Sequence, residues 1–203
     1  MAEPPVLRLF SFRPVRSAFD TVLRDVMVPD LRLFPELLDL HIGRRGPDEL
    51  GPRMIASVWS SAAAMVAAVG EDFDPPIFHP EFLDETSDRV LEIMPLAMSL
   101  RFERASPARI MRALRGSIRS GERAAYIEEA RLGTLADVEA GHGPVALHLG
   151  TGPGDDAFTT VSVWESWSDI EAATGGDIER PTATRHPERI VDWDASHFEI
   201  VEI

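Results

Sequence analysis

The stretch Ile55-Ala-Ser-Val-Trp-Ser-Ser (55–61) returns as Thr160-Val-Ser-Val-Trp-Glu-Ser (160–166), and this recurrence decides the fold. Its tryptophans, Trp59 and Trp164, stand 105 residues apart. Each stretch follows a segment that carries a histidine, and these histidines, His41 and His148, are 107 residues apart. The spacing shortens by two residues inside the intervening Gly-rich loop, where an insertion or deletion is tolerated, and it returns to 107 after the tryptophans. The pattern indicates an internal repeat.

Two further pairs keep the same order and the spacing of 107 residues. Phe19 corresponds to Tyr126, and His79-Pro80 corresponds to His186-Pro187. Several landmarks in one order are typical of a tandem duplication, and we place the boundary between the copies near 105–107. The predicted domains are therefore residues 1–105 and residues 106–203.

Hydrophobic periodicity and turn residues predict the same elements in both copies. The first copy is expected to form a strand at 6–12, a helix from residue 17 that Pro29 ends or kinks, a hairpin of 37–42 and 54–59, a helix at 60–69 closed by Gly70, and a strand within 91–102. The second is expected to form a strand at 110–118, a helix at 122–138, a hairpin of 145–149 and 158–164, a helix at 166–173, and a strand within 196–202.

Each copy thus follows the order β-α-β-β-α-β, which makes an antiparallel sheet with helices on one face. The other face must pack against something. We predict an α+β fold of two tandem ferredoxin-like units, packed sheet to sheet as an intramolecular α+β barrel with a ligand cavity inside.

Strand alternation sorts the side chains of the second strand of each copy. One face is aliphatic and is expected under the helices, and it carries Leu38, Leu40 and Ile42 in the first copy. Asp39 and His41 share the opposite face. His148 alternates in the same way with aliphatic neighbours in the second copy. Both histidines are therefore predicted to point into the space between the sheets.

The remaining candidate side chains lie on the third and last strands. They are Ser57 and Trp59 in the first copy, and Ser162, Trp164 and His197 in the second. Together with the two histidines they predict two related pockets. The alternatives are that the histidines are hydrogen-bonded structural residues and that the tryptophans are packing anchors.

The net charge of −14 disfavours partners with anionic surfaces, so neither nucleic acid nor a membrane surface is expected. Eight arginines within residues 101–131 are a local exception, which we interpret as a solvated linker and helix face rather than an anion-binding groove. No apolar run reaches the roughly 18 residues of a membrane span, and the first residues do not resemble an export signal. The cytoplasm is the predicted compartment.

The chain contains no Cys, Lys, Asn or Gln. These absences exclude thiolate catalysis, a lysine Schiff base and a Walker-type phosphate loop. The histidines show neither the H-x-x-x-H nor the HExxH spacing, so no metal site is predicted. We likewise predict no cofactor.

The order of elements, the strand that ends in Val-Trp-Ser/Glu-Ser before a short helix, and the later His-Pro resemble the antibiotic-biosynthesis monooxygenase-like family. That family belongs to the dimeric α+β barrel (ferredoxin-like) superfamily. The resemblance covers essentially the whole chain, twice. Since two such units usually dimerise, it implies a monomeric pseudo-dimer or a homodimer here.

The resemblance also implies a cofactor-independent monooxygenase that acts on a small aromatic or quinol-type metabolite. His41 and His148 would then be catalytic bases, and Trp59 and Trp164 would pack on the substrate ring. The alternative is a non-catalytic protein of the same fold that binds a small molecule, including haem through an axial histidine. A haem-degrading branch of the superfamily uses an Asn–Trp–His set, which a chain without Asn does not contain.

Overall fold

The computed structural model describes residues 3–17, 19–70, 84–103, 106–152, 156–182 and 186–201. The chain divides into a first unit, Met1–Ile93 with Phe198–Ile203, and a second unit, Met94–His197. Strands β4 (Thr86–Arg101) and β8 (Ile190–Ile200) each have residues in both units. The predicted domain boundary at 105/106 lies at the edge of a described range and stays a prediction.

The sheet of the first unit has the strand order β4–β1–β3–β2, and the end of β8 pairs with β2. Its other strands are β1 (Val6–Pro14), β2 (Leu37–Arg44) and β3 (Arg53–Trp59). β3 is antiparallel to both neighbours, with Ser57 opposite Arg8 on β1 and Leu40 on β2. This register fixes which side chains share a face of the sheet.

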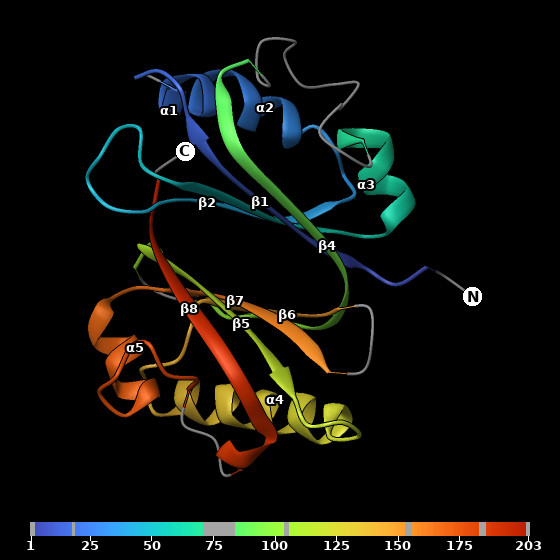
Figure 1. The fold of residues 1–203 in the computed structure, drawn as a ribbon, viewed down its shortest axis with the longest axis vertical. Helices are drawn as coiled ribbons and strands as arrows, with labels where there is room; N and C mark the ends of the chain where they lie inside the picture. Colours follow the sequence, from blue (N-terminus) through green and yellow to red (C-terminus); the bar gives the residue numbers. More distant parts are fainter. Residues whose placement is uncertain are drawn as a thin grey trace. The chain divides into compact units, whose positions relative to one another are not determined.

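Helices cover one face of the first sheet (Figure 1). α1 (Phe19–Val22), a π-helical turn (Leu23–Met27) and α2 (Val28–Leu31) form one continuous helical segment. Pro29 therefore does not end the helix: a proline lacks an N–H and its ring clashes with the carbonyl four residues earlier, and the wider π turn accommodates both effects. α3 (Ala62–Val69) begins at Ser61, whose hydroxyl accepts a hydrogen bond from the Ala64 N–H at 3.1 Å.

The sheet of the second unit has the order β8–β5–β7–β6–β4. Its own strands are β5 (Ile110–Ile118), β6 (Ala146–Thr151) and β7 (Ala157–Trp164). The long helix α4 (Arg123–Glu139) and the shorter α5 (Trp167–Thr174) lie on one face of this sheet, and a 3₁₀ turn (Pro187–Arg189) leads into β8 (Figure 1). The α+β fold class predicted from the sequence is confirmed.

Two strands begin earlier than predicted. β4 starts at Thr86 rather than near Leu91, and β8 starts at Ile190 rather than Ser196. The early segment of β4 is mostly polar and exposed, so it lacks the apolar alternation that marks a strand. The early segment of β8 does alternate, but its apolar residues Val191 and Trp193 are exposed. Backbone pairing holds both segments instead, since the Val15 N–H donates to the Glu85 carbonyl and the Arg119 N–H to the Arg189 carbonyl, each at 2.8 Å.

The prediction for Leu38 is wrong. The register of β2 against β3 shifts between Leu37 and Asp39, so Leu38 is the extra residue of a β-bulge and its side chain is exposed. Leu37 instead packs against Trp59 under the helices. Leu40 and Ile42 lie in the helix-covered core as predicted.

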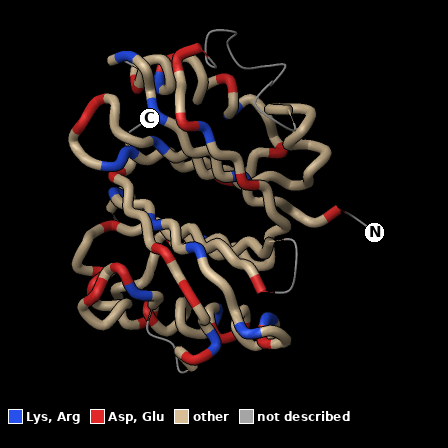
Figure 2. Tube along the Cα trace, in the orientation of Figure 1, with Lys and Arg blue, Asp and Glu red and all other residues tan. Residues whose placement is uncertain are grey.

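Charged residues are spread over the helices and loops of each unit (Figure 2). Within the described ranges, no helix has both the length and the apolar character needed to cross a bilayer.

Candidate functional site

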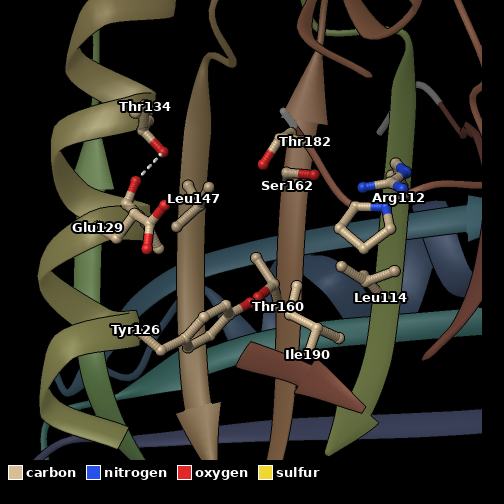
Figure 3. A pocket seen from close by; sticks show the side chains of 13 residues that line it. Arg112, Leu114, Tyr126, Glu129, Thr134, Leu147, Thr160, Ser162, Thr182 and Ile190 are labelled. Atoms are coloured by element: carbon tan, nitrogen blue, oxygen red, sulfur yellow. Dashed lines mark hydrogen bonds between the residues drawn. The ribbon is translucent and has the colours of Figure 1, made fainter. Parts of the chain in front are cut away.

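A small pocket lies between α4 and the helix-covered face of the second sheet (Figure 3). We call it the inner pocket; its volume is about 40 Å³, room for one or a few water molecules. Polar side chains reach it from the strands and from the helix, among them Arg112 (β5), Thr160 and Ser162 (β7), and Tyr126, Glu129 and Thr134 (α4). Such a mixture of apolar walls and converging polar groups is typical of a ligand site.

Arg112 is the dominant charge of the inner pocket. Only 2% of its surface is exposed, and burial lowers the pKa of its guanidinium to about 10, so it remains a cation at neutral pH. One edge of the guanidinium is fixed, because Nε donates to the Ile178 carbonyl at 3.2 Å and Nη2 donates to the Arg180 carbonyl. The charge of Glu179 raises the pKa of Arg112 by less than burial lowers it, and no carboxylate of the described residues lies within ion-pair distance. An anion in the pocket would therefore meet a cation that is only partly compensated.

The other two ionisable groups of the inner pocket are already engaged. Glu129 accepts hydrogen bonds from the His186 N–H at 2.8 Å and from the Arg189 guanidinium, which offsets its charge. Tyr126 is hydrogen-bonded to Thr160, and burial raises the pKa of its phenol, which therefore stays neutral. The inner pocket thus selects for negative charge at Arg112.

A larger space, the outer cleft, adjoins the inner pocket and shares Pro181, Thr182 and Ile190 with it. Its volume is about 470 Å³, within the range of small-molecule sites. Trp193 and Arg180 also line it, and the Trp193 ring is 45% exposed. The cleft therefore has room for a ring system whose polar end reaches the inner pocket.

The two units share a buried arrangement of arginine, serine and tryptophan. Arg8 lies opposite Ser57 in the first unit, as Arg112 lies opposite Ser162 in the second. In each unit the indole Nε1 of the tryptophan two residues later donates to that serine hydroxyl, at 3.0 Å from Trp59 and 2.8 Å from Trp164. Trp59 and Trp164 are 1% and 0% exposed and lie in the helix–sheet cores.

The predicted grouping of each histidine with its tryptophan is wrong. Ser57 pairs with Leu40 and lies on the helix-covered face, whereas His41 pairs with Ala56 on the opposite face. In the second unit Leu147 pairs with Ser162, and His148 pairs with Val161 on the opposite face. Apart from the bulge at Leu38, alternation within each of these strands agrees with the structure, but relating neighbouring strands requires their register, which one sequence does not provide.

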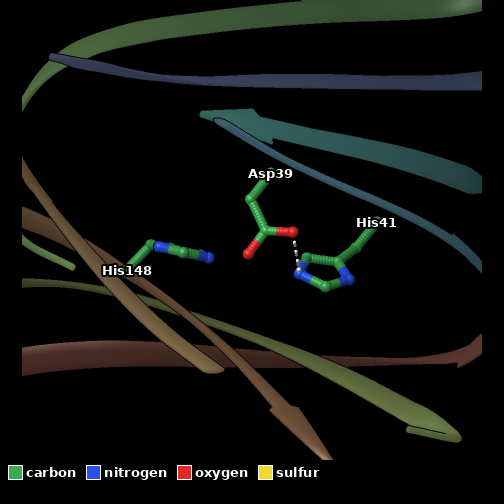
Figure 4. A group of neighbouring side chains, drawn as sticks. All are labelled: Asp39, His41 and His148. Atoms are coloured by element: carbon green, nitrogen blue, oxygen red, sulfur yellow. Dashed lines mark ion pairs between the residues drawn. The ribbon is translucent and has the colours of Figure 1, made fainter. Parts of the chain in front are cut away.

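His41 lies beside Asp39, with its Nε2 at 3.3 Å from the carboxylate Oδ1 (Figure 4). The two side chains are 17% and 9% exposed, and the same carboxylate oxygen accepts a hydrogen bond from the Leu40 N–H at 3.0 Å. The Asp39 carboxylate therefore holds the orientation of the His41 ring.

The other predicted histidines lie in the second unit, and neither lines the inner pocket or the outer cleft. His148 is 1% exposed, and its Nδ1 is 3.0 Å from the Ser99 hydroxyl on the neighbouring strand. His197 packs against the Trp167 ring at a centroid distance of 5.3 Å and lies 3.7 Å from a Glu179 carboxylate oxygen. Of the predicted binding residues, Ser162 is the one that lines the inner pocket.

Arg112, Tyr126 and Glu129 were not predicted as site residues. The sequence places Arg112 in an arginine-rich segment that we interpret as solvated, and its burial contradicts that interpretation. A signal was present, because Val6-Leu-Arg-Leu-Phe and Ile110-Met-Arg-Ala-Leu each place one arginine inside an apolar strand. A charged residue at that position of a buried strand is a candidate for function.

No protein-family model matches the sequence, and no curated protein is similar to it. Solved structures are similar over nearly the whole chain. A candidate monooxygenase from Fusobacterium nucleatum has a TM-score of 0.75 at 10% identity, with 100% of this chain and 94% of that chain covered. An anthrone oxidase-like protein has a TM-score of 0.61 at 14% identity, with coverages of 100% and 94%.

A third structure is a ferredoxin-fold protein from Listeria monocytogenes that is related to antibiotic biosynthesis monooxygenases. Its TM-score is 0.58 at 8% identity, with 99% of this chain and 97% of that chain covered. At such identities the likeness establishes the fold. The predicted resemblance to antibiotic-biosynthesis monooxygenase-like proteins is confirmed as a likeness of fold.

Proposed function

We propose that the protein is an oxidoreductase of the monooxygenase type that acts on a small planar phenol, quinol or anthrone. The ring system occupies the outer cleft, and its oxygen enters the inner pocket beside Arg112. The observation that carries this proposal is a buried arginine, held on one edge by backbone carbonyls, in a pocket that opens into a cleft of about 470 Å³. The names of the similar structures support the reaction class.

The chemistry assigned to the pocket needs only the substrate, dioxygen and Arg112. A cation within about 4–6 Å lowers the pKa of an acidic group by about 1–3, so Arg112 favours the substrate anion and the proton leaves through the open cleft. For an anthrone, the carbanion adds dioxygen and takes up a proton to give a hydroperoxide. Loss of water from the hydroperoxide forms the carbonyl. One oxygen atom enters the product and the other leaves in water, so no further reductant is consumed.

His41 and His148 stay predicted proton acceptors for the same reaction. His41 has the better supported role, because Asp39 lies within ion-pair distance and some of its ring is exposed. Neither histidine contributes to the lining of the second unit's pockets. A reaction at Arg112 and a reaction at the histidines therefore predict different activities for variants at these residues.

Haem, the alternative ligand, fits these pockets poorly. Among the described residues that line them there is no His, Cys or Met to serve as an axial ligand, and the phenol of Tyr126 is buried against Thr160. We derive no haem-dependent step.

Oxygen uptake with a panel of anthrones, naphthols and quinols tests the proposal. Arg112→Met removes the charge and keeps a long apolar side chain, and we expect its rate to fall by roughly 100-fold or more. Arg131→Met is the matched control, because it removes an exposed arginine of the same unit and should leave the rate unchanged. Bound 1-naphthol, followed by absorbance without oxygen, should ionise at lower pH in the wild type than in Arg112→Met.

The double variant His41→Ala/His148→Ala separates the two assignments. Activity that survives in the histidine variant and is lost in Arg112→Met places the reaction at the inner pocket. The reverse pattern would reject that assignment and favour the histidines. If no substrate causes oxygen uptake but 1-naphthol still binds, the protein is the non-catalytic binding protein.

The cytoplasm as compartment and a pseudo-dimeric monomer or homodimer as assembly belong to the same proposal. Gel filtration with light scattering measures the second point directly.

A further inference from the structure

Gly133 occupies an unusual position in α4. It lies on the stripe of the helix that faces the sheet, one turn beyond Ala130 and two turns beyond Tyr126, and it lines the inner pocket with them. Apart from its chain neighbours and the backbone of its own helix, no described residue would place an atom within 4 Å of a Cβ on Gly133, although neighbouring Thr134 is buried. Because this face of the helix is packed against the sheet, the missing side chain of Gly133 leaves part of the inner pocket unfilled.

Folding gives no reason for a glycine at this position. Gly133 lies well inside a 17-residue helix, where glycine is less favourable than alanine because it loses more backbone entropy. It has no left-handed backbone conformation, and no close approach of another chain segment requires the absence of a side chain. The remaining reason is the pocket that it borders.

We infer that Gly133 is a specificity-determining residue that sets the width of the substrate edge admitted to the inner pocket. This inference rests on the proposed function. With a volume of about 40 Å³, the inner pocket takes the oxygen and the adjoining edge of a ring rather than the whole ring. A leucine side chain at 133 would fill most of that space. The substrate class is therefore narrowed to planar aromatics whose ionising oxygen is flanked by small groups.

The test combines stability and binding in the full-length protein. Gly133→Ala should raise Tm by about 2–4 °C, since the methyl group meets no atom and the helix gains an alanine. Gly133→Leu should bind 1-naphthol at least about tenfold more weakly by fluorescence titration without oxygen. Ala136→Leu places a leucine at an exposed position of the same helix and should bind like the wild type. 2-Methyl-1-naphthol should lose more affinity than 1-naphthol on Gly133→Ala.

Different outcomes reject different claims. A lower Tm for Gly133→Ala would show that the space beside Gly133 is absent. Unchanged affinity of Gly133→Leu, with binding by the wild type intact, would overturn the role of Gly133 alone. If the wild type binds neither naphthol, the pocket proposal fails and the role of Gly133 fails with it.

Discussion

Two arginines at matching positions illustrate how the surroundings of a residue decide its role. Arg112 has backbone carbonyls on one edge and a pocket beside it. Arg8 is 4% exposed, and its Nε has no hydrogen-bond partner among the residues that the structure describes. Its guanidinium carbon lies 5.4 Å from the centroid of the Phe10 ring. Burial lowers the pKa of both to about 10. Few interactions of Arg8 compensate for the free energy that is lost when its charge is buried.

Replacing Arg8 by methionine should therefore stabilise the protein. A pKa of about 10 in the folded state, against 12.5 unfolded, corresponds to a penalty of roughly 3 kcal/mol. Both states are protonated below pH 10, so the penalty is complete at pH 7 and fades only as pH rises through 10. We expect urea unfolding at pH 7 to show Arg8→Met more stable by about 1–3 kcal/mol.

Arg112→Met is the comparison for that experiment. It removes two hydrogen bonds to the segment that ends at Arg180, so it should gain less stability than Arg8→Met or lose some. An equal gain in stability for Arg8→Met and Arg112→Met would show that the hydrogen bonds of Arg112 do not stabilise the fold.

The hydrogen bonds from the tryptophans to the serine hydroxyls lead to a prediction about the stability of two serine variants. Ser57→Ala and Ser162→Ala each leave a buried indole N–H without its acceptor. Such a group costs about 1–3 kcal/mol, and urea unfolding should show this loss for both variants. Threonine keeps the hydroxyl and suits a strand, so Ser→Thr should recover part of the stability. Full stability in either alanine variant would mean that the indole finds another acceptor.

At the scale of elements, Gly116 determines how closely β8 approaches β5. A Cβ at this position would overlap the Asp192 carbonyl oxygen and lie 2.8 Å from the Phe158 ring. Gly116→Ala should therefore destabilise the protein by about 1–3 kcal/mol through overpacking. The Tm of Gly116→Ala should be measured together with that of Gly133→Ala, because the same substitution is expected to lower Tm at 116 and to raise it at 133. A rise at both sites would show that β8 can move away from β5 at little cost.

The sequence predicted elements well where local signals were complete. β5 was predicted at its observed bounds because apolar residues stand at both of its ends. α3 and α5 were predicted close to their observed ends because a glycine follows each of them. It failed where the partner strand supplies the stabilisation, as at the start of β8. The site was missed for the same reason. Tertiary structure sets the register that aligns Arg112 with Ser162, and it brings α4 over both residues.

At the scale of the whole chain, the matching registers of the two units support the proposal of a tandem duplication. Arg8 and Arg112 hold the same place relative to Ser57 and Ser162, although the copies share few other residues on these strands. Two copies that keep the same buried arginine, serine and tryptophan can still differ in the residues that pack next to them. In the first unit, Phe34 packs 6.2 Å from the Trp59 ring, whereas in the second unit a pocket lies beside Ser162.

The net charge of −14 gives a final prediction about how ligands reach that pocket. An anionic probe such as 1-naphthoate approaches against a negative field, while neutral 1-naphthol does not. The Debye length falls from about 30 Å at 0.01 M salt to about 8 Å at 0.15 M, so salt should speed the association of the anion and leave that of the neutral ring unchanged. Stopped-flow fluorescence of Trp193 at the outer cleft measures both rates. A rate for the anion that falls with salt would mean that the local field of Arg112 and Arg180 outweighs the charge of the chain, and Arg112→Met should then abolish that dependence.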